Sequence, residues 1–443
     1  MTLAFHGETG VTSWGRVIRR PQTVARPPFA SDLLAWAGTD KGPRLAVGLG
    51  RSYGDTGLYS DGRMIMAQGL DRLISFDPVS GLLRAQAGLS LAELLKVVVP
   101  RGWFVPVTPG TRRVTLGGAV ANDVHGKNHT RAGTFGRHVR ALTLLRSDRG
   151  VVEIGPDRES DLFAATVGGL GLTGIILDIT LQLTPIASAN LDVETFPLGN
   201  LDDFFALNAD SLEKCEQAVA WIDCTQRGAK VGLGVYTRAN WASDGDLRPH
   251  GDKVRAIPIE APGFAINPLS LALFNTAYRT AQLLKPRRGK AHYAGFFHPL
   301  DALEDWNKLY GPTGFYQYQC VVPARDGQAA MQELLSIIGR SGDGSALVVL
   351  KTFGDLASPG MMSFPRPGYT LALDFRNRGE PTLRLLAALD AVVRAAGGAL
   401  YPAKDGRLPR AMLDQGFPRF DRFLGFRDPA CGSDFLTRME RDL

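Results

Sequence analysis

The segment that decides the fold is PGTRRVTLGGAVANDVHGKNHTRAGTFG, Pro109–Gly136. Its centre, ANDVHGKNHT (Ala121–Thr130), gathers two histidines, a lysine, an aspartate and two asparagines, and it lacks the apolar periodicity of a packed helix or strand. Glycines on both sides let backbone amides approach a ligand closely and form anion-binding nests. A single loop of this kind is more often a surface loop. Whether this one lines a site therefore depends on other segments of the chain that have the same character.

Two further glycine-rich segments point the same way: GLGRSYGD, Gly48–Asp55, and GGLGLTG, Gly168–Gly174. The first follows a predicted strand, RLAVGLG, and can wrap a diphosphate without a helix. The second contains GxGxxG, but a dinucleotide-binding fingerprint needs a strand before it and a helix after it. Here a helix-like DLFAATV precedes and a strand-like run follows, so we exclude the Rossmann interpretation and predict a tight turn. Three such loops within about 130 residues favour a large phosphate-bearing cofactor, because ordinary domains rarely need so many glycine turns.

The composition is that of a globular protein: 443 residues, 44% hydrophobic and 21% charged, enough for two or three cores. No apolar run is as long as the about 18 residues that a membrane-spanning helix needs, so we expect no transmembrane helix. The N-terminus lacks the long apolar stretch of a signal peptide, so we expect no cleaved signal. The cysteines form no CxxC pair and no Cys/His spacing typical of a metal site: Cys215, Cys224, Cys320 and Cys431. We expect no metal, a reduced compartment, and a protein that is cytoplasmic or peripheral at the cell membrane.

The pattern of the chain changes at Pro185. Before it, short strands alternate with glycine turns. Ser90 and Glu93 have capping-box spacing at the start of a predicted helix, LAELLKVVV. Ala141–Gly155 predicts a hairpin and Thr173–Pro185 a strand. After Pro185 strand and helix patterns alternate, which indicates a second, α+β domain.

The net charge of +6 is concentrated in one window. Between Arg248 and Lys290, eight Lys or Arg residues stand against Asp252 and Glu260, a local excess of six. The apolar centre of the window, Ala261–Tyr278, suits a membrane-surface contact, and it equally suits a core helix between charged loops. No nucleic-acid-binding motif accompanies it, and stacking aromatics are few, so we do not expect a nucleic-acid partner.

Three groups of polar residues are candidates for a site. His125 lies in the polar loop NDVHGKNH, and Lys404 lies beside Tyr401 in YPAKDGR. Gln317 and Gln319 share one face of a predicted strand, GFYQYQC, where they can bind sugar hydroxyls. A lone histidine is more often structural, most lysines are solvated, and the glutamines can mark an exposed strand face. The residue types alone leave both interpretations open.

Together several blocks of the chain resemble the flavoprotein oxidases of the vanillyl-alcohol-oxidase superfamily. The resemblance covers nearly the whole chain and rests on GLGRSYGD, PGTRRVTLGGAVANDVHGKNH, GTFG, LFAATVGGLGLTGII, FHPLD, GPTGFYQYQCVVP and YPAKDGR. Within the superfamily, these blocks are most similar to the oxidases of polyprenyl-phosphate-linked ribose. The resemblance implies an α+β fold with an FAD-binding domain at 1–188, a substrate-binding domain with an antiparallel sheet at 189–400, and a C-terminal segment at 401–443 that returns to the FAD domain.

The same resemblance implies the residues of the site. Lys404 is expected to handle the proton and stabilise charge, and His125 to position flavin and substrate. Substrate binding is expected from Lys127, Trp221, Gln317, Gln319 and Lys351. FAD binding is expected from Gly48, Gly50, Arg51, Ser52, Tyr53, Gly54, Asp55, Gly110, Thr115, Leu116, Gly117, Gly118, Asn122, Asp123, Val124, His125, Gly126, Ile176 and Tyr401. Many relatives attach the flavin through a histidine in a GxGHS-like turn, where this chain has Arg51, so non-covalent FAD is expected.

The implied activity is oxidation of the C2 hydroxyl of a polyprenyl-phosphate-linked pentose to a 2-keto sugar, in which a hydride passes to the flavin and a base takes the proton. This is the first half of a two-enzyme epimerisation that supplies a cell-wall arabinan precursor, and an NAD(P)H-dependent short-chain reductase completes it. Phe297, Thr370 and Ala372 stand where the family pattern has Tyr, Asn and Cys, which leaves the exact sugar and lipid open. The alternatives are a soluble aldonolactone or alditol oxidase of the same superfamily and a flavin-binding protein without turnover.

Overall fold

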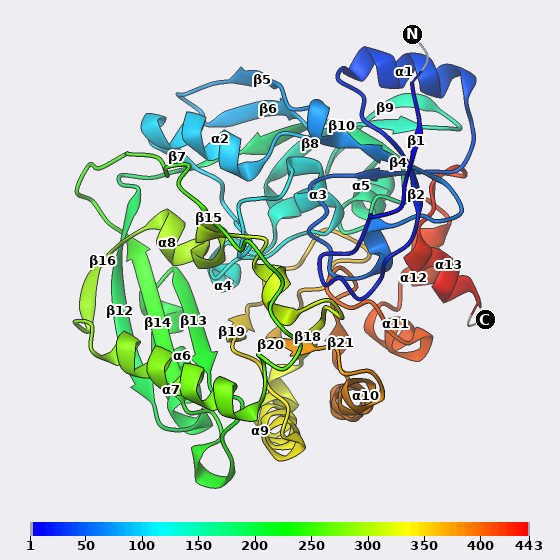
Figure 1. Ribbon diagram of the computed structural model, residues 1–443. Coiled ribbons are helices and arrows are strands. Elements are labelled where there is room, and N and C mark those ends of the chain that lie inside the picture. Colours follow the sequence, from blue (N-terminus) through cyan, green and yellow to red (C-terminus); the bar gives the residue numbers. More distant parts are fainter. Residues whose placement is uncertain (1–2, 442–443) are drawn as a thin grey trace.

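The computed structural model describes residues 3–441, and the part before residue 186 forms two larger sheets and one short strand pair, with short helices around them (Figure 1). The four-stranded sheet has the order β1 (His6–Glu8), β2 (Gln22–Ala25), β4 (Arg63–Met66), β3 (Arg44–Val47). The five-stranded sheet has the order β5 (Leu73–Phe76), β6 (Leu82–Gln86), β10 (Ile175–Gln182), β8 (Val139–Arg146), β9 (Gly150–Ile154). The helices of this part are α1 (Ala30–Thr39), α2 (Leu91–Val98), α3 (Leu116–Ala121), α4 (His129–Ala132) and α5 (Ser160–Thr166).

The later part of the chain builds one eight-stranded sheet in which each pair of neighbours is antiparallel. Its order is β16 (Arg288–His292), β12 (Asn190–Leu198), β14 (Gly234–Trp241), β13 (Gln217–Ile222), β19 (Val348–Phe353), β20 (Gly368–Arg376), β18 (Phe315–Val322), β21 (Ala399–Leu400). Its helices are α6 (Leu201–Lys214), α7 (Pro268–Leu283), α8 (Tyr293–Phe297), α9 (Ala324–Ser341) and α10 (Glu380–Ala395). Two short pairs complete the strands: β7 (Trp103–Phe104) with β11 (Thr184–Pro185), and β15 (Arg255–Ala256) with β17 (Leu303–Glu304).

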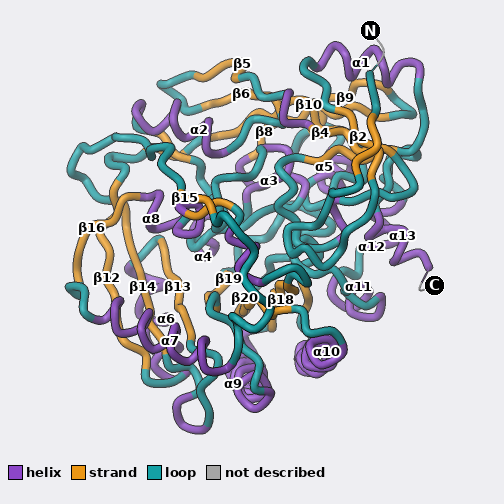
Figure 2. The backbone as a smooth tube through the Cα atoms, in the orientation of Figure 1, coloured by secondary structure: helices purple, strands orange, loops and turns teal. Residues whose placement is uncertain are grey.

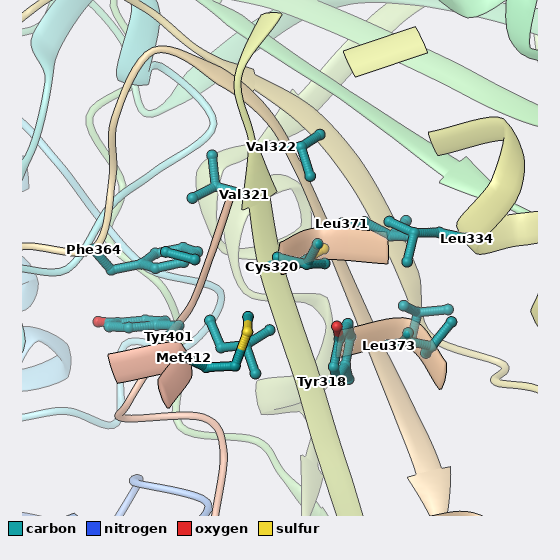
Figure 3. Packing of buried hydrophobic residues seen from close by; sticks show 14 of the residues in the cluster. Tyr318, Cys320, Val321, Val322, Leu334, Phe364, Leu371, Leu373, Tyr401 and Met412 are labelled. Atoms are coloured by element: carbon teal, nitrogen blue, oxygen red, sulfur yellow. The ribbon is translucent and has the colours of Figure 1, made fainter. Parts of the chain in front are cut away.

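The large sheet has two different faces, because successive side chains of a strand point to opposite sides. One face is apolar and packs against α6, α9 and α10 in the main hydrophobic core. Figure 3 shows part of this core, with Tyr318 and Cys320 of β18 beside Leu371 and Leu373 of β20 and Leu334 of α9. The alternate positions point to the opposite face; they are mainly polar on β18, β19 and β20 and mixed on β12, β13 and β14, where α7 covers this face (Figure 2).

The C-terminal segment, with α11 (Arg410–Gly416), α12 (Phe420–Leu424) and α13 (Asp434–Arg441), returns to the N-terminal sheets. The backbone N–H of Arg44 donates to the carbonyl of Ala430 at 2.7 Å, and that of Ser60 donates to the Asp434 carboxylate at 2.7 Å. These contacts tie the last helices to the first strands. The expected α+β fold is confirmed, while the domain limits at residues 188 and 400 stay a prediction.

Several predicted elements are present as expected. Ser90 caps α2, since its Oγ accepts from the Glu93 N–H at 3.1 Å. The hairpin is β8–β9, and GGLGLTG is a turn between α5 and β10. Ala121–Thr130, which lacks apolar periodicity, is non-helical from residue 122 to residue 128; α3 ends at Ala121 and α4 begins at His129. Thr115 caps α3, and Leu116, Ala119 and Val120 form its buried side, a face too short for a periodicity test to detect.

Candidate active site

A cavity of about 1140 Å³ lies between the glycine-rich loops of the N-terminal part and the polar face of the eight-stranded sheet. All but three of the residues expected to bind FAD or substrate line it, together with both expected catalytic residues. The fold therefore brings together segments that lie more than 350 residues apart in the chain, from Gly48 to Lys404.

Glycines form one wall of this cavity and leave room for a ligand. Gly50 has φ +62°, in the left-handed region that favours glycine, and a Cβ added to Gly50 or to Gly110 would meet nothing within 4 Å. A Cβ at Gly54 would lie 2.5 Å from the backbone of Gly406, so this glycine permits the close approach of the C-terminal segment. Within the described residues, the backbone N–H groups of Gly50, Arg51 and Ser52 donate to no protein acceptor. Unpaired backbone donors in an open glycine loop suit a phosphate group.

The polar face of the sheet forms the opposite wall, and the strand register sets its side chains next to each other. Gln319 of β18 pairs with Ala372 of β20, and Lys351 of β19 pairs with Thr370 of β20. Gln317 pairs with Asp374, and its Nε2 donates to the Asp374 carboxylate at 2.7 Å. The prediction that the two glutamines share a face is confirmed, and this face is directed into the cavity.

His125 lies where the polar loop meets this sheet, and both of its ring nitrogens have a partner. Its Nδ1 lies 2.8 Å from Lys351 Nζ, and its Nε2 lies 3.0 Å from Gln319 Nε2. Burial, and then the charge of Lys351, holds the pKa of His125 well below its ordinary value, so the ring is neutral at neutral pH. A neutral ring carries one N–H, and the two contacts fix its orientation.

Lys404 lies at the junction of the two walls. Its Nζ sits 4.0 Å from the centre of the Tyr53 ring, and the Tyr53 N–H donates to the carbonyl of Ala403 at 3.0 Å. Burial lowers the pKa of Lys404, while the nearby carboxyl of Asp374 acts in the opposite direction. Burial also raises the pKa of Asp374. A buried amine with a lowered pKa can exist unprotonated near neutral pH, as a general base requires.

Two more lysines add positive charge to the same cavity. Burial lowers the pKa of Lys127 to about 7 and that of Lys351 to about 7. Lys127 Nζ donates to the carbonyl of Phe296 and lies 4.4 Å from the centre of its ring. A bound anion would restore the charged form of these amines, so the arrangement suits a ligand that carries negative charge.

Tyr401 connects the C-terminal segment to the polar loop. Its hydroxyl donates to the carbonyl of Asn122 at 2.7 Å, and its ring stacks on Phe364 with centres 4.7 Å apart (Figure 3). The Tyr401 backbone N–H donates to the carbonyl of Gln319 at 2.9 Å. The turn that carries Lys404 is thereby held against the sheet.

Asp55, Leu116 and Asp123 are the expected FAD-binding residues that do not line the cavity. Asp55 forms a two-point ion pair with Arg438 of α13, at 2.7 and 3.0 Å. Leu116 is fully buried in the hydrophobic core, and Asp123 accepts from the Gly136 N–H at 2.8 Å and from the hydroxyl of Ser363. In this geometry the three side chains support the wall rather than form it.

Asp374 is the functional candidate that the residue patterns missed. It is 1% exposed, faces Lys404 and accepts from Gln317. The signal was present in YTLALDF, where Thr370, Ala372 and Asp374 alternate with Leu371, Leu373 and Phe375 and therefore share one face of a strand. Within residues 3–441, no group of His, Cys, Asp and Glu is arranged to hold a metal ion.

Comparison with known proteins agrees with this geometry. Residues 24–155 match the model of a family described as an FAD binding domain. The chain is 37% identical to decaprenylphosphoryl-β-D-ribose oxidase of Mycolicibacterium smegmatis over 89% of each chain. It is 36% identical to an uncharacterised protein of Streptomyces coelicolor over 79% of this chain and 98% of that relative. An alditol oxidase of a Streptomyces species is 28% identical over only 44% of this chain and 47% of its own.

Proposed function

The chain belongs to the family of FAD-binding oxidases that includes decaprenylphosphoryl-β-D-ribose oxidase, and on that premise we propose that it oxidises the C2 hydroxyl of a polyprenyl-phosphate-linked pentose to a ketone. The observation that carries the proposal is the composition of the cavity. A glycine wall with unpaired backbone donors faces a wall of two glutamines, a neutral histidine and three lysines whose pKa values are lowered. The first wall suits a dinucleotide and the second suits a sugar that bears a phosphate.

The residues present fit FAD on structural grounds. Gly50 and Gly110 leave the loops open where a side chain would fill the cavity, and the free N–H groups of residues 50–52 are available to the diphosphate. When bound, FAD supplies the acceptor for the hydride that leaves the carbinol carbon. Among the residues that the structure describes, His125 is the only histidine that lines the cavity, and both of its nitrogens are engaged, while Arg51 stacks on Trp14 at 4.0 Å. We therefore propose that the FAD is held without a covalent bond.

Lys404 is the proposed base. Oxidation of a secondary alcohol removes a hydride from carbon and a proton from oxygen, and the unprotonated amine of Lys404 takes that proton at Nζ. Its lowered pKa makes the unprotonated form accessible, and Asp374 keeps the protonated form stable afterwards. His125, fixed between Lys351 and Gln319, orients the pentose, and Gln317 and Lys127 provide further hydrogen-bond donors to hydroxyl and phosphate oxygens.

The product of this step is a 2-keto sugar that retains its lipid phosphate. Reduction of the ketone from the opposite face would complete an epimerisation, and it requires a hydride donor. We propose that an NAD(P)H-dependent short-chain reductase performs this second step, which places the protein in the first half of a two-enzyme reaction that supplies a cell-wall arabinan precursor.

The proposal is tested by adding candidate substrates to the oxidised protein without oxygen and following the flavin absorbance at about 450 nm. Polyprenyl-phosphoryl ribose is expected to bleach the flavin, and free alditols and aldonolactones are expected to leave it oxidised. Bleaching by a free alditol or lactone would assign the protein to the alternative function, a soluble sugar oxidase. A flavin that none of these compounds reduces would contradict both.

A further inference from the structure

Exposed apolar side chains are concentrated in α7 and the segments next to it in the chain. Six large apolar residues between positions 259 and 284 are exposed, and most of them are more exposed than the second such group among the described residues, Leu73, Ile74, Val79 and Leu82 of the β5–β6 hairpin. The six are Ile259 (74%), Phe264 (76%), Leu269 (71%), Leu273 (64%), Phe274 (47%) and Leu284 (80%). Concentrated apolar exposure of this kind marks an interaction surface.

The apolar residues of α7 lie on its outer side. At about 100° per residue, Leu269, Leu273 and Leu284 fall within an arc of about 60°. The buried residues Leu271 and Asn275 lie on the opposite side, where the helix contacts β12 and β14 (Figure 1). The remaining outer positions are alanine and threonine, without a charge. A helix on the surface of a water-soluble protein normally exposes a polar face to the solvent. The helix α9, for example, exposes Arg325, Glu333 and Arg340.

Positive charge follows directly at the end of this helix. Lys285 and Arg287 are exposed, and in the part of the chain that the structure describes neither has an ion-pair partner. The neighbouring Arg288 and Lys290 are paired with Glu194 and Asp244. The unpaired cations adjoin Leu284, so apolar and positive groups share one edge of the molecule.

The same helix borders the cavity of the candidate active site. Phe274, Tyr278, Gln282 and Lys285 contribute to the cavity wall. The Tyr278 ring lies 4.8 Å from that of Trp221 on the sheet and stacks on Phe274 at 6.1 Å. These three aromatic rings lead from the polar face of the sheet to the exposed surface of α7.

We propose that Leu269, Leu273 and Leu284 of α7, with Lys285 and Arg287, form a docking surface for an anionic lipid bilayer. The helix would lie in the plane of the lipid headgroups, with its leucines in the acyl boundary and its cations at the phosphates. The rings of Phe274, Tyr278 and Trp221 then provide the route by which a polyprenyl chain enters the cavity from the bilayer. This route rests on the proposed function, whereas the docking surface does not.

The test is vesicle co-sedimentation of the full-length protein with FAD, using phosphatidylcholine vesicles with and without about half phosphatidylglycerol. The wild-type protein is expected to bind the anionic vesicles more tightly. Changing Lys285→Gln and Arg287→Gln together is expected to weaken that binding by about 30-fold, since each cation near an anionic surface contributes about fivefold. Changing Leu269→Gln and Leu273→Gln is expected to weaken binding to both kinds of vesicle.

Matched controls are available on the same chain. Val79 and Val151 are 88% and 53% exposed far from α7 in sequence, and Lys41 and Lys230 are exposed cations without an ion-pair partner among the described residues. Gln substitutions at these positions are expected to leave binding unchanged. The docking surface would be overturned if the control substitutions weakened binding as much as those at α7 and its basic end, or if the wild type did not bind vesicles. A concentration-dependent dimer that dissociates on substitution of Leu269 and Leu273 would also overturn it.

Flavin bleaching separates this inference from the proposed function. A detergent-dispersed substrate with a short prenyl chain is expected to reduce the flavin of the variant with Leu269→Gln and Leu273→Gln at the wild-type rate, since neither leucine lines the cavity. Vesicle binding without bleaching of the wild type by any lipid-linked ribose would refute the proposed function and leave the docking surface in place. Bleaching without selective vesicle binding would refute the docking surface alone.

Discussion

Lys351 Nζ lies 2.8 Å from His125 Nδ1, and this contact determines where the proton of the histidine ring can be. When the amine is charged it donates to Nδ1, the single N–H of the neutral ring is on Nε2, and the Gln319 amide has to turn its Oε1 toward that N–H in order to accept from it. When the amine is neutral it can accept from Nδ1–H, and Nε2 then accepts from the amide of Gln319, 3.0 Å away. Since burial brings the pKa of Lys351 to about 7, both states are accessible near neutral pH.

Replacing Lys351 by methionine is expected to raise the pKa of His125, because the charge of Lys351 is, after burial, the second cause that lowers it. A histidine with a raised pKa becomes protonated at a higher pH, so the acid limb of the pH–rate profile should move to higher pH. The rate of anaerobic flavin reduction as a function of pH measures this shift. An unchanged acid limb would show that the contact does not control the histidine.

Lys404→Met is expected to lower the rate of flavin reduction by about 10²–10⁴-fold, the usual contribution of a positioned base. The absorption spectrum of the bound flavin should remain, since the change removes a proton acceptor and leaves the glycine wall intact. A variant that reduces its flavin at the wild-type rate would exclude Lys404 as the base. It would also revive the interpretation of the protein as a flavin binder without turnover.

Asp374→Asn is expected to shift the pH at which Lys404 loses its proton. The carboxyl of Asp374 raises the pKa of Lys404 against the effect of burial, so its removal should lower that pKa further. The unprotonated base then forms at lower pH, and the limb of the pH–rate profile that reports Lys404 should move in the same direction. Gln317→Leu serves as a control that removes the hydrogen bond to Asp374 and keeps the carboxyl. If this limb of the pH–rate profile stayed in place in Asp374→Asn, Asp374 would not control the pKa of Lys404.

Gly50→Ala is expected to weaken FAD binding and to destabilise the protein by about 1 kcal/mol, because φ is +62° at this position and an L side chain is strained there. The added methyl group also faces the cavity, where the glycine meets nothing within 4 Å. Isothermal titration of the apoprotein with FAD measures the first effect and urea unfolding the second. Gly228→Ala has a similar φ of +58° and nothing within 4 Å, and it should show only the effect on stability.

Arg438→Met is expected to lower the free energy of unfolding by about 3 kcal/mol, since it leaves the buried carboxylate of Asp55 without its partner. The double variant Asp55→Asn with Arg438→Met should recover part of this loss. Chemical unfolding of the two variants checks the prediction, and equal stability of Arg438→Met and the wild type would contradict it.

The sequence predicts the local elements and the glycine loops well, because both depend on neighbouring residues. The cap at Ser90, the hairpin β8–β9 and the reversed order of helix and strand around GGLGLTG are all readable from short patterns. The placement of Gln317 and Gln319 on one face follows from the period of a strand. Periodicity could not show which ligand the loops surround, and the resemblance to known oxidases supplied that step.

Other features depend on contacts between distant segments, which short patterns do not contain. Asp374 faces Lys404 only because β20 and the C-terminal turn meet at the cavity. Asp55 stood in a glycine-rich motif, yet its partner is Arg438, 383 residues later in the chain. For α7, apolar residues between charged loops suited a core helix as well as a surface helix. Only the exposure of Leu269 and Leu273 decides between them.

The most direct test of the central claim is stopped-flow reduction of the flavin by polyprenyl-phosphoryl ribose that carries deuterium at C2. Flavin reduction is expected to be slower with this substrate than with the unlabelled one, deuterium at C1 or C3 is expected to have no such effect, and the expected product is a 2-keto sugar. Equal rates for the C2-labelled and unlabelled substrates under single-turnover conditions, or an isotope effect at another carbon, would contradict the central claim.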